Sequence, residues 1–131
     1  DDRDFEQRAV RELVAEQLLG EESEESEVVD DGRGDASARV ADDRSVAELE
    51  PDAILVYGDT NTTLDGALVA AKGGVPLAHV EAGMRSGDRT MPEEINRLVT
   101  DSLGQLLLCP TEAAIENLRR EGLGDRASVT G

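Results

Sequence analysis

From residue 51 onward, short apolar runs alternate with stretches in which apolar residues recur every three or four positions. The runs predict strands at 53–57, 75–80, 105–109 and 127–130, and the stretches between them predict helices at 62–72, 93–103 and 112–121. This order is typical of a parallel sheet with crossover helices. Because the runs contain no polar alternation, we expect strands that are covered on both faces.

Residues that begin and end helices support these boundaries. Gly73 and Gly74 follow the first predicted helix, and Pro92 stands where a first-turn proline is favoured. Thr111 is a candidate N-cap for the last helix, and Gly122 is a candidate stop. The capping residues and the apolar pattern therefore predict the same elements.

The first fifty residues have a different texture. Apolar spacing predicts a helix over 4–19 and another over 36–49, which ends before Pro51. The intervening residues 21–35 are rich in acids and glycine, which indicates a solvated or disordered loop with a weak two-valine strand at Val28. We therefore divide the chain into an acidic segment, 1–50, and an α/β segment, 51–131.

The 131 residues suffice for one domain, and their charge is strongly negative. Thirty acidic against thirteen basic residues give a net charge of -17, which argues against general nucleic-acid binding because phosphates would be repelled. Lys72 is the only lysine among the thirteen basic residues. This preference for arginine over lysine, with the excess of acids, favours a salt-adapted source; the alternative is a GC-rich genome. A single cysteine favours a reducing, cytoplasmic compartment, and no apolar stretch is long enough to span a membrane.

Three carboxylates follow predicted strands or open a predicted helix. Asp59 comes two residues after one apolar run, Glu81 comes directly after the next, and Glu93 begins the following helix. In open α/β sheets the ligand lies beyond the carboxyl ends of the strands, so the three acids should approach one cleft and could serve as acid and base. Each also has a structural alternative: Asp59 as a helix cap, Glu81 as a partner of Arg85, and Glu93 as a complement to the helix dipole.

Four further residues are candidates for substrate binding. Arg85 lies in a glycine-containing loop at the same edge, where it could hold a phosphate or carboxylate. Asn96 and Arg97 follow Glu93 by about one turn, so they could face the cleft or form a surface pair. His79 could orient a substrate or transfer a proton, or it could be a hydrogen-bonded core residue.

The sequence lacks the residues that several other kinds of site require. The sequence has neither a dinucleotide fingerprint nor a P-loop, and its one histidine and one cysteine do not form a zinc site. Cys109, at the end of an apolar run, is expected to be a core residue. We therefore expect no cofactor.

The loops that carry these candidates resemble the non-hydrolysing UDP-N-acetylglucosamine 2-epimerases. The resemblance covers residues 51–131, and several motifs occur in the family's order and spacing. They are Tyr-Gly-Asp-Thr-Asn-Thr-Thr at 57–63, His-Val-Glu-Ala-Gly-Met-Arg-Ser at 79–86, Met-Pro-Glu-Glu-Ile-Asn-Arg at 91–97, Cys-Pro-Thr-Glu at 109–112 and Val-Thr-Gly at 129–131.

The resemblance implies a fold and a reaction. Family members have two Rossmann-like domains in a GT-B-like arrangement, and this segment resembles the second part of the first domain. They interconvert UDP-GlcNAc and UDP-ManNAc by eliminating and re-adding UDP, without metal or nicotinamide. The resemblance places the catalytic carboxylates on Asp59, Glu81 and Glu93, and it implies a UDP-sugar partner and a homodimer for the intact enzyme.

The sequence also departs from the family. Residues 1–50 contain no Gly-Thr-Arg-Pro-Glu turn, Gly87 stands where archaeal relatives often have an aromatic residue, and Asp65 replaces a usual alanine. A second domain is not present in the chain. We therefore expect a piece of an epimerase that is inactive alone; the alternatives are a non-enzymatic Rossmann-like module, or a piece of an epimerase acting on a related UDP-sugar.

Overall fold

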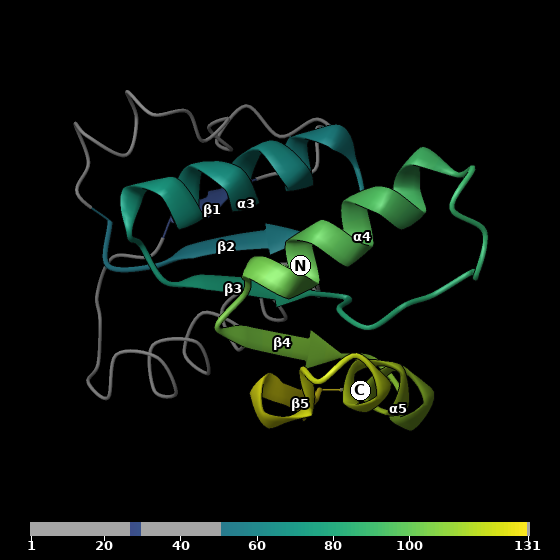
Figure 1. Cartoon of the computed structure of the whole chain (residues 1–131). Coiled ribbons are helices and arrows are strands. Elements are labelled where there is room, and N and C mark those ends of the chain that lie inside the picture. Colours follow the sequence, from purple (N-terminus) through teal and green to yellow (C-terminus); the bar gives the residue numbers. More distant parts are fainter. Residues whose placement is uncertain (1–26, 30–50, 131) are drawn as a thin grey trace, which may run out of the picture.

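Five parallel strands form one sheet in which the spatial order follows the chain order (Figure 1). The computed structural model describes residues 27–29 and 51–130. The strands are β1 (Glu27–Val29), β2 (Ile54–Tyr57), β3 (Leu77–Val80), β4 (Leu106–Cys109) and β5 (Ala127–Val129). Each pairs in parallel with the next. The expected α/β fold with a parallel sheet is therefore confirmed.

Three helices connect β2 to β5 and lie over the same face of the sheet (Figure 1). They are α3 (Asn61–Gly73), α4 (Pro92–Leu103) and α5 (Glu112–Arg120), and a short 3₁₀ helix, η2 (Gly124–Arg126), precedes β5. Right-handed crossovers between adjacent strands that advance in one direction place every helix on one side. Every element predicted beyond residue 51 is confirmed, with boundaries that differ by no more than two residues.

The ends of the helices are made by the predicted residues. Thr111 Oγ1 accepts a hydrogen bond from the backbone N–H of Ala114 at 3.1 Å, and Pro92 lies in the first turn of α4. Gly74 follows α3 with a φ of 69°, and Gly122 follows α5 with a φ of 80°. Left-handed backbone of this kind is readily adopted only by glycine, so these two residues end their helices.

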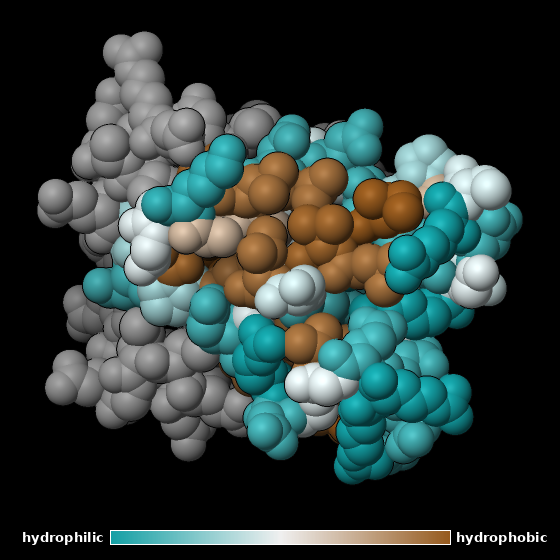
Figure 2. Space-filling model, in the orientation of Figure 1, coloured by the Kyte–Doolittle hydropathy of each residue, from teal (hydrophilic) through white to brown (hydrophobic). Residues whose placement is uncertain are grey.

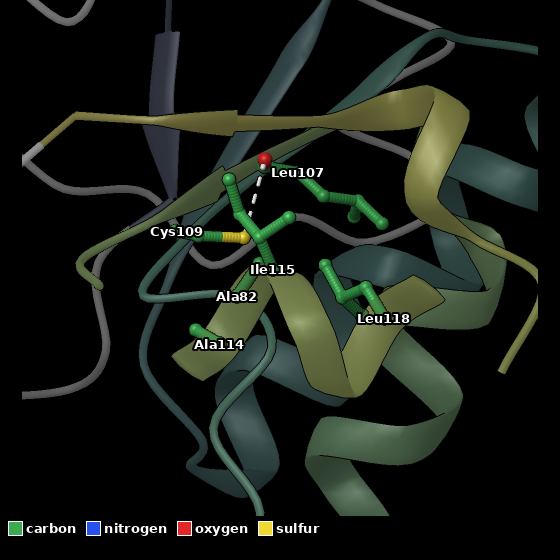
Figure 3. Packing of buried hydrophobic residues seen from close by; sticks show 6 residues of the cluster. All are labelled: Ala82, Leu107, Cys109, Ala114, Ile115 and Leu118. Atoms are coloured by element: carbon green, nitrogen blue, oxygen red, sulfur yellow. Dashed lines mark hydrogen bonds between the residues drawn. The ribbon is translucent and has the colours of Figure 1, made fainter. Parts of the chain in front are cut away.

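Strands β2, β3 and β4 are buried on both faces, as their continuous apolar runs predict, whereas β5 is only partly buried. Val56, Leu77 and Leu107 project toward the helices, and each is at most 1% exposed. Residues on the opposite face of β2, β3 and β4, such as Leu55, are also buried. Figure 3 shows how α5 packs on the sheet through Ala114, Ile115 and Leu118, which meet Leu107, Cys109 and Ala82. Truncation of one such buried leucine costs roughly 2–5 kcal/mol.

Part of the acidic segment joins the sheet. The weak two-valine pattern at Val28 is confirmed as strand β1, which pairs with β2 in the register Val28 to Leu55. The predicted helices over 4–19 and 36–49, and the remainder of the predicted loop over 21–35, lie outside the described residues.

Candidate active site

The turns that follow β2 and β3 lie side by side at the carboxyl edge of the sheet. The last residues of the two strands, Tyr57 and Val80, are paired, and the Gly58 N–H donates to the Val80 carbonyl at 3.1 Å. Glu81 follows β3 immediately, and Asp59 follows β2 by two residues. Separate parts of the chain therefore bring two of the three predicted carboxylates to one edge.

Asp59 is held by helix α4. Arg97 Nη2 and Nε donate to Asp59 Oδ2 at 2.9 and 3.1 Å, and the Asn96 side-chain amide donates to the Asp59 carbonyl at 2.9 Å. The predicted helix cap is supplied instead by Thr60, which accepts from the Thr63 N–H. Asp59 cannot serve as this cap because its carboxylate is turned toward Arg97.

Glu81 occupies an unusual backbone conformation. Its φ is 68°, the only positive φ of a non-glycine residue among the described ones. Such conformations cost of order 1–3 kcal/mol and occur often at functional sites. The carboxylate lies over the neighbouring turn, since a Cβ built on Gly58 would be 3.8 Å from Glu81 Oε2. Within the described part of the chain it has no hydrogen-bond or ion-pair partner.

The predicted alternative of a Glu81–Arg85 ion pair is wrong. Arg85 Nε and Nη2 donate to the two carboxylate oxygens of Glu121 at 2.8 and 2.7 Å, and Nη2 also lies 2.9 Å from Asp101 Oδ2. Burial alone would lower the pKa of Arg85, but the two carboxylates raise it above its ordinary value. The turn after Glu81 directs Arg85 toward α4 and α5, and so away from Glu81.

The two adjacent acids at the start of α4 have different environments. Glu93 is exposed and has no hydrogen-bond or ion-pair partner among residues 51–130, whereas Glu94 is buried. The Glu94 carboxylate accepts the backbone N–H groups of Ser86 and Gly87, at 3.0 and 2.7 Å, and pairs with Arg97 at 3.0 Å. Burial would raise the pKa of Glu94, but these donors outweigh it and hold the pKa below its usual range.

Arg97 therefore links two acids from different elements. Its guanidinium contacts Asp59 after β2 and Glu94 on its own helix. Burial would lower its pKa, but the hydrogen bonds to both carboxylates raise it. The alternative of a surface pair does not describe it, because the Arg97 side chain is only 14% exposed.

His79 is a buried, hydrogen-bonded residue, one of the two alternatives that the sequence left open. Its Nδ1 lies 2.6 Å from Asp101 Oδ1, and its Nε2 lies 2.7 Å from the Gly58 carbonyl. The side chain is completely enclosed. Burial would raise the pKa of Asp101, but the contacts with His79, Gly83 and Arg85 lower it.

Sequence reasoning did not select Glu94 or Asp101 as functional residues. The two acids are seven positions apart on α4, so they lie on one face of the helix, which is buried. Ionised side chains are rarely buried unless they are paired. The position of two acids on the buried face of an amphipathic helix could therefore have identified them from the sequence.

Cys109 is a core residue, and burial raises its thiol pKa to about 11. No group of three or more His, Cys, Asp or Glu side chains in the described ranges is arranged to hold a metal ion. Of the helices described, none is long and apolar enough to cross a membrane.

Comparison with known proteins gives the class of this site. The solved UDP-GlcNAc 2-epimerase of Methanocaldococcus jannaschii superposes with a TM-score of 0.67 at 51% identity over 68% of this chain and 25% of that one. The enzyme of Neisseria meningitidis bound to UDP-GlcNAc gives a TM-score of 0.66 at 38% identity, with the same coverage. The fold is therefore that of part of a UDP-GlcNAc 2-epimerase, as the sequence resemblance implies.

The family model described as UDP-N-acetylglucosamine 2-epimerase matches residues 16–131, and the chain belongs to this family. The match begins well before Pro51, so it includes much of the acidic segment. The M. jannaschii UDP-N-acetylglucosamine 2-epimerase is 60% identical over 74 residues, which are 56% of this chain and 20% of that protein. The UDP-2,3-diacetamido-2,3-dideoxy-D-glucuronate 2-epimerase of Pseudomonas aeruginosa is 56% identical over 83 residues, or 63% and 23%. The chain thus spans about a quarter or less of these relatives.

Proposed function

We propose that this chain supplies the catalytic carboxylates of an epimerase that interconverts UDP-GlcNAc and UDP-ManNAc. The observation that carries the proposal is the position of Asp59 and Glu81 on adjacent turns, at the ends of paired strands. The family match and the solved relatives bound to UDP-GlcNAc support this substrate. The chain alone is proposed to be inactive, because it spans only part of those relatives.

The reaction requires removal of a weakly acidic hydrogen. A carboxylate takes the proton from C2 of the sugar while the C1–O bond breaks, so that UDP leaves with the bonding electron pair and a 2-acetamidoglucal remains. UDP then adds back to C1, and a proton returns to the other face of C2. The carboxylates of Glu81 and Glu93, which have no partner among the described residues, are suited to accept or donate these protons, and Asp59 is oriented by Arg97.

Two of the four residues expected to bind substrate stand beside the carboxylates. Asn96 and Arg97 contact Asp59, and we propose that they border the sugar. Arg85 is paired with Glu121, and a phosphate or carboxylate of the substrate would take the place of Glu121 there. His79 is enclosed by the protein and contacts the Asp59 turn through Gly58, so it would act on the substrate only indirectly.

A second UDP-sugar is a specific alternative. The P. aeruginosa relative is named for UDP-2,3-diacetamido-2,3-dideoxy-D-glucuronate, which carries a carboxylate and a second acetamido group. The test uses the full-length protein that contains residues 51–130 of this chain, called the complete enzyme below. Proton NMR would follow each substrate in turn, and we expect UDP-ManNAc from UDP-GlcNAc. Product from the diacetamido sugar alone would favour the alternative, and product from neither would favour a non-enzymatic module.

The intact enzyme is proposed to be a homodimer that associates through α3 and α4. Figure 2 shows apolar side chains gathered on the face over these helices. Leu68 on α3 and Ile95 on α4 are 37% and 40% exposed. Association with a second copy would remove this apolar surface from water. Sedimentation of the complete enzyme should give a dimer that Leu68→Glu with Ile95→Glu dissociates, while Val129→Glu, another exposed apolar position, should not. A monomeric wild type would contradict this.

The setting of the protein is proposed from composition. The excess of acids and the single lysine favour a salt-adapted source, the unpaired cysteine favours the cytoplasm, and the negative charge disfavours nucleic-acid partners. The division of the chain at residue 50 is likewise proposed from composition.

In a salt-adapted chain, the midpoint of thermal unfolding should rise between dilute buffer and molar potassium chloride. An unchanged midpoint would contradict that assignment.

A further inference from the structure

A buried carboxylate near the end of α4 contacts the turn after β3 directly and the turn after β2 through His79. Asp101 is completely enclosed, as is His79. Asp101 Oδ1 lies 2.6 Å from His79 Nδ1, while Oδ2 accepts the Gly83 N–H at 3.0 Å and pairs with Arg85 at 2.9 Å. Neither the sequence motifs nor the family comparison assigned Asp101 a role.

His79 has a hydrogen-bond partner on each ring nitrogen. A carbonyl oxygen can only accept, so the 2.7 Å contact between His79 Nε2 and the Gly58 carbonyl requires a hydrogen on Nε2. Opposite Nδ1 is the carboxylate of Asp101, whose other oxygen accepts the Gly83 N–H and pairs with Arg85. The His79 ring therefore bridges the Asp101 carboxylate and the Gly58 carbonyl.

The two contacts end on the turns that bear the catalytic residues. Gly58 immediately precedes Asp59, and Gly83 follows Glu81 by two residues. Gly58, Glu81 and Gly83 all have positive φ, at 73°, 68° and 80°. For Glu81, which is not a glycine, such backbone is sparsely populated and persists where the surroundings hold it. One carboxylate, acting directly and through one ring, restrains both turns.

We propose that Asp101 is a positioning residue, which sets the separation of the Asp59 and Glu81 turns through the His79 ring and the Gly83 amide. The inference rests on the proposed function, because its purpose is to align two carboxylates about one substrate. Misplacement of a reacting group by about 1 Å can reduce a rate by about a hundredfold. Asp101 itself need not touch the substrate.

The contacts of the ring can be tested in the 131-residue chain without a variant. His79 is the only histidine, so nitrogen-15 NMR of histidine-labelled chain reports this ring alone. We expect an Nε2–H signal that is protected from exchange with water, because Nε2 contacts the Gly58 carbonyl. Ring signals identical to those of a solvent-exposed histidine would overturn the network.

The positioning role is tested by Asp101→Asn, which keeps the shape of the side chain but removes its charge. The matched control is Thr100→Val, one position earlier, where the buried hydroxyl has no hydrogen-bond partner among the described residues. Backbone amide signals of Gly58, Asp59, Glu81 and Gly83 should shift in Asp101→Asn and remain in place in Thr100→Val. A folded Asp101→Asn chain with all four signals unmoved would overturn the proposal. If that variant does not fold, the wild-type ring measurement still decides.

Kinetics of the complete enzyme separate positioning from mere stability. Per folded molecule, Asp101→Asn should lower kcat by about a hundredfold with little change in KM, because the substrate contacts remain while the carboxylates are displaced. Thr100→Val should retain both constants. An unchanged kcat in folded Asp101→Asn would overturn the proposal. Absence of activity in the wild type would instead contradict the proposed function, and the amide signals would still report on the network.

Discussion

Arg97 directs two of its N–H groups to a single oxygen of Asp59, although 38 positions separate the two residues in the chain. The same guanidinium contacts Glu94 through its third nitrogen. The orientation of a predicted catalytic carboxylate after β2 therefore depends on helix α4, which begins only after the next strand.

Removal of this contact should impair catalysis more than folding. Hydrogen bonds to charged groups contribute about 1.5–3 kcal/mol, and roughly 1.4 kcal/mol corresponds to a tenfold change in rate. We therefore expect Arg97→Met to lower the turnover of the complete enzyme by about tenfold or more. Arg119→Met is the control, because Arg119 is largely exposed and, among the residues that the structure describes, forms an ion pair only with Glu116 on its own helix. Equal turnover in the two variants would show that Asp59 needs no such support.

The three predicted carboxylates should each be required for proton transfer. Asp59→Asn, Glu81→Gln and Glu93→Gln retain size and lose the ability to act as base, so each should reduce turnover by about a hundredfold or more. Exchange of the sugar C2 hydrogen with solvent deuterium should fall in parallel. Asp65→Asn, an exposed change on α3, should leave exchange unaltered. Near-normal exchange in all three amide variants would remove the catalytic assignment.

Gly83 should be far less tolerant of substitution than a glycine with the same backbone conformation elsewhere. A Cβ on Gly83 would lie 2.5 Å from the Ala114 carbonyl oxygen, whereas one on Gly122 would meet nothing within 4 Å. Both residues have a φ of 80°. Gly122→Ala should therefore lose only the roughly 1–2 kcal/mol of left-handed backbone, and Gly83→Ala about 1–3 kcal/mol more from the overlap. Urea unfolding of both variants measures the difference, and equal losses would contradict the predicted overlap.

Glu94 should contribute stability that disappears in acid. Its pKa is lowered in the folded state, so the folded chain binds fewer protons than the unfolded one below the ordinary glutamate pKa. The contribution is fully present above about pH 4.3 and is lost as the pH falls through the lowered value. Glu94→Gln should therefore destabilise the protein most near neutrality, and its free energy of unfolding should approach that of the wild type in acid. Glu112→Gln, at an exposed position of α5, is the control. A gap between Glu94→Gln and wild type that stayed constant down to pH 2 would contradict the ionised carboxylate.

The isolated 131-residue chain should neither bind UDP-GlcNAc tightly nor epimerise it. Arg85 and Arg97 are already paired with carboxylates, and the net charge of -17 opposes a diphosphate. Calorimetry in high salt should detect no micromolar binding, and proton NMR should detect no UDP-ManNAc. Either signal would show that this chain forms a nucleotide site without further protein.

The apolar pattern alone determined the elements beyond residue 51 and their order. Apolar runs without polar alternation require burial on both faces, and local residues such as Thr111 and Pro92 act within a turn of themselves. The positions of Asp59 and Glu81 at one sheet edge also followed from the sequence, because the carboxyl ends of parallel strands meet there.

Which side chains pair was decided only by the tertiary structure. The sequence offered Glu81 as a partner for nearby Arg85, but the left-handed turn at Glu81 and the packing of Gly83 on α5 direct that arginine to Asp101 and Glu121. Helical periodicity identifies the buried face of α4, but it does not identify what that face meets. The buried acids there are partnered by groups from distant turns, which only the crossing of α4 over the sheet brings within hydrogen-bonding distance.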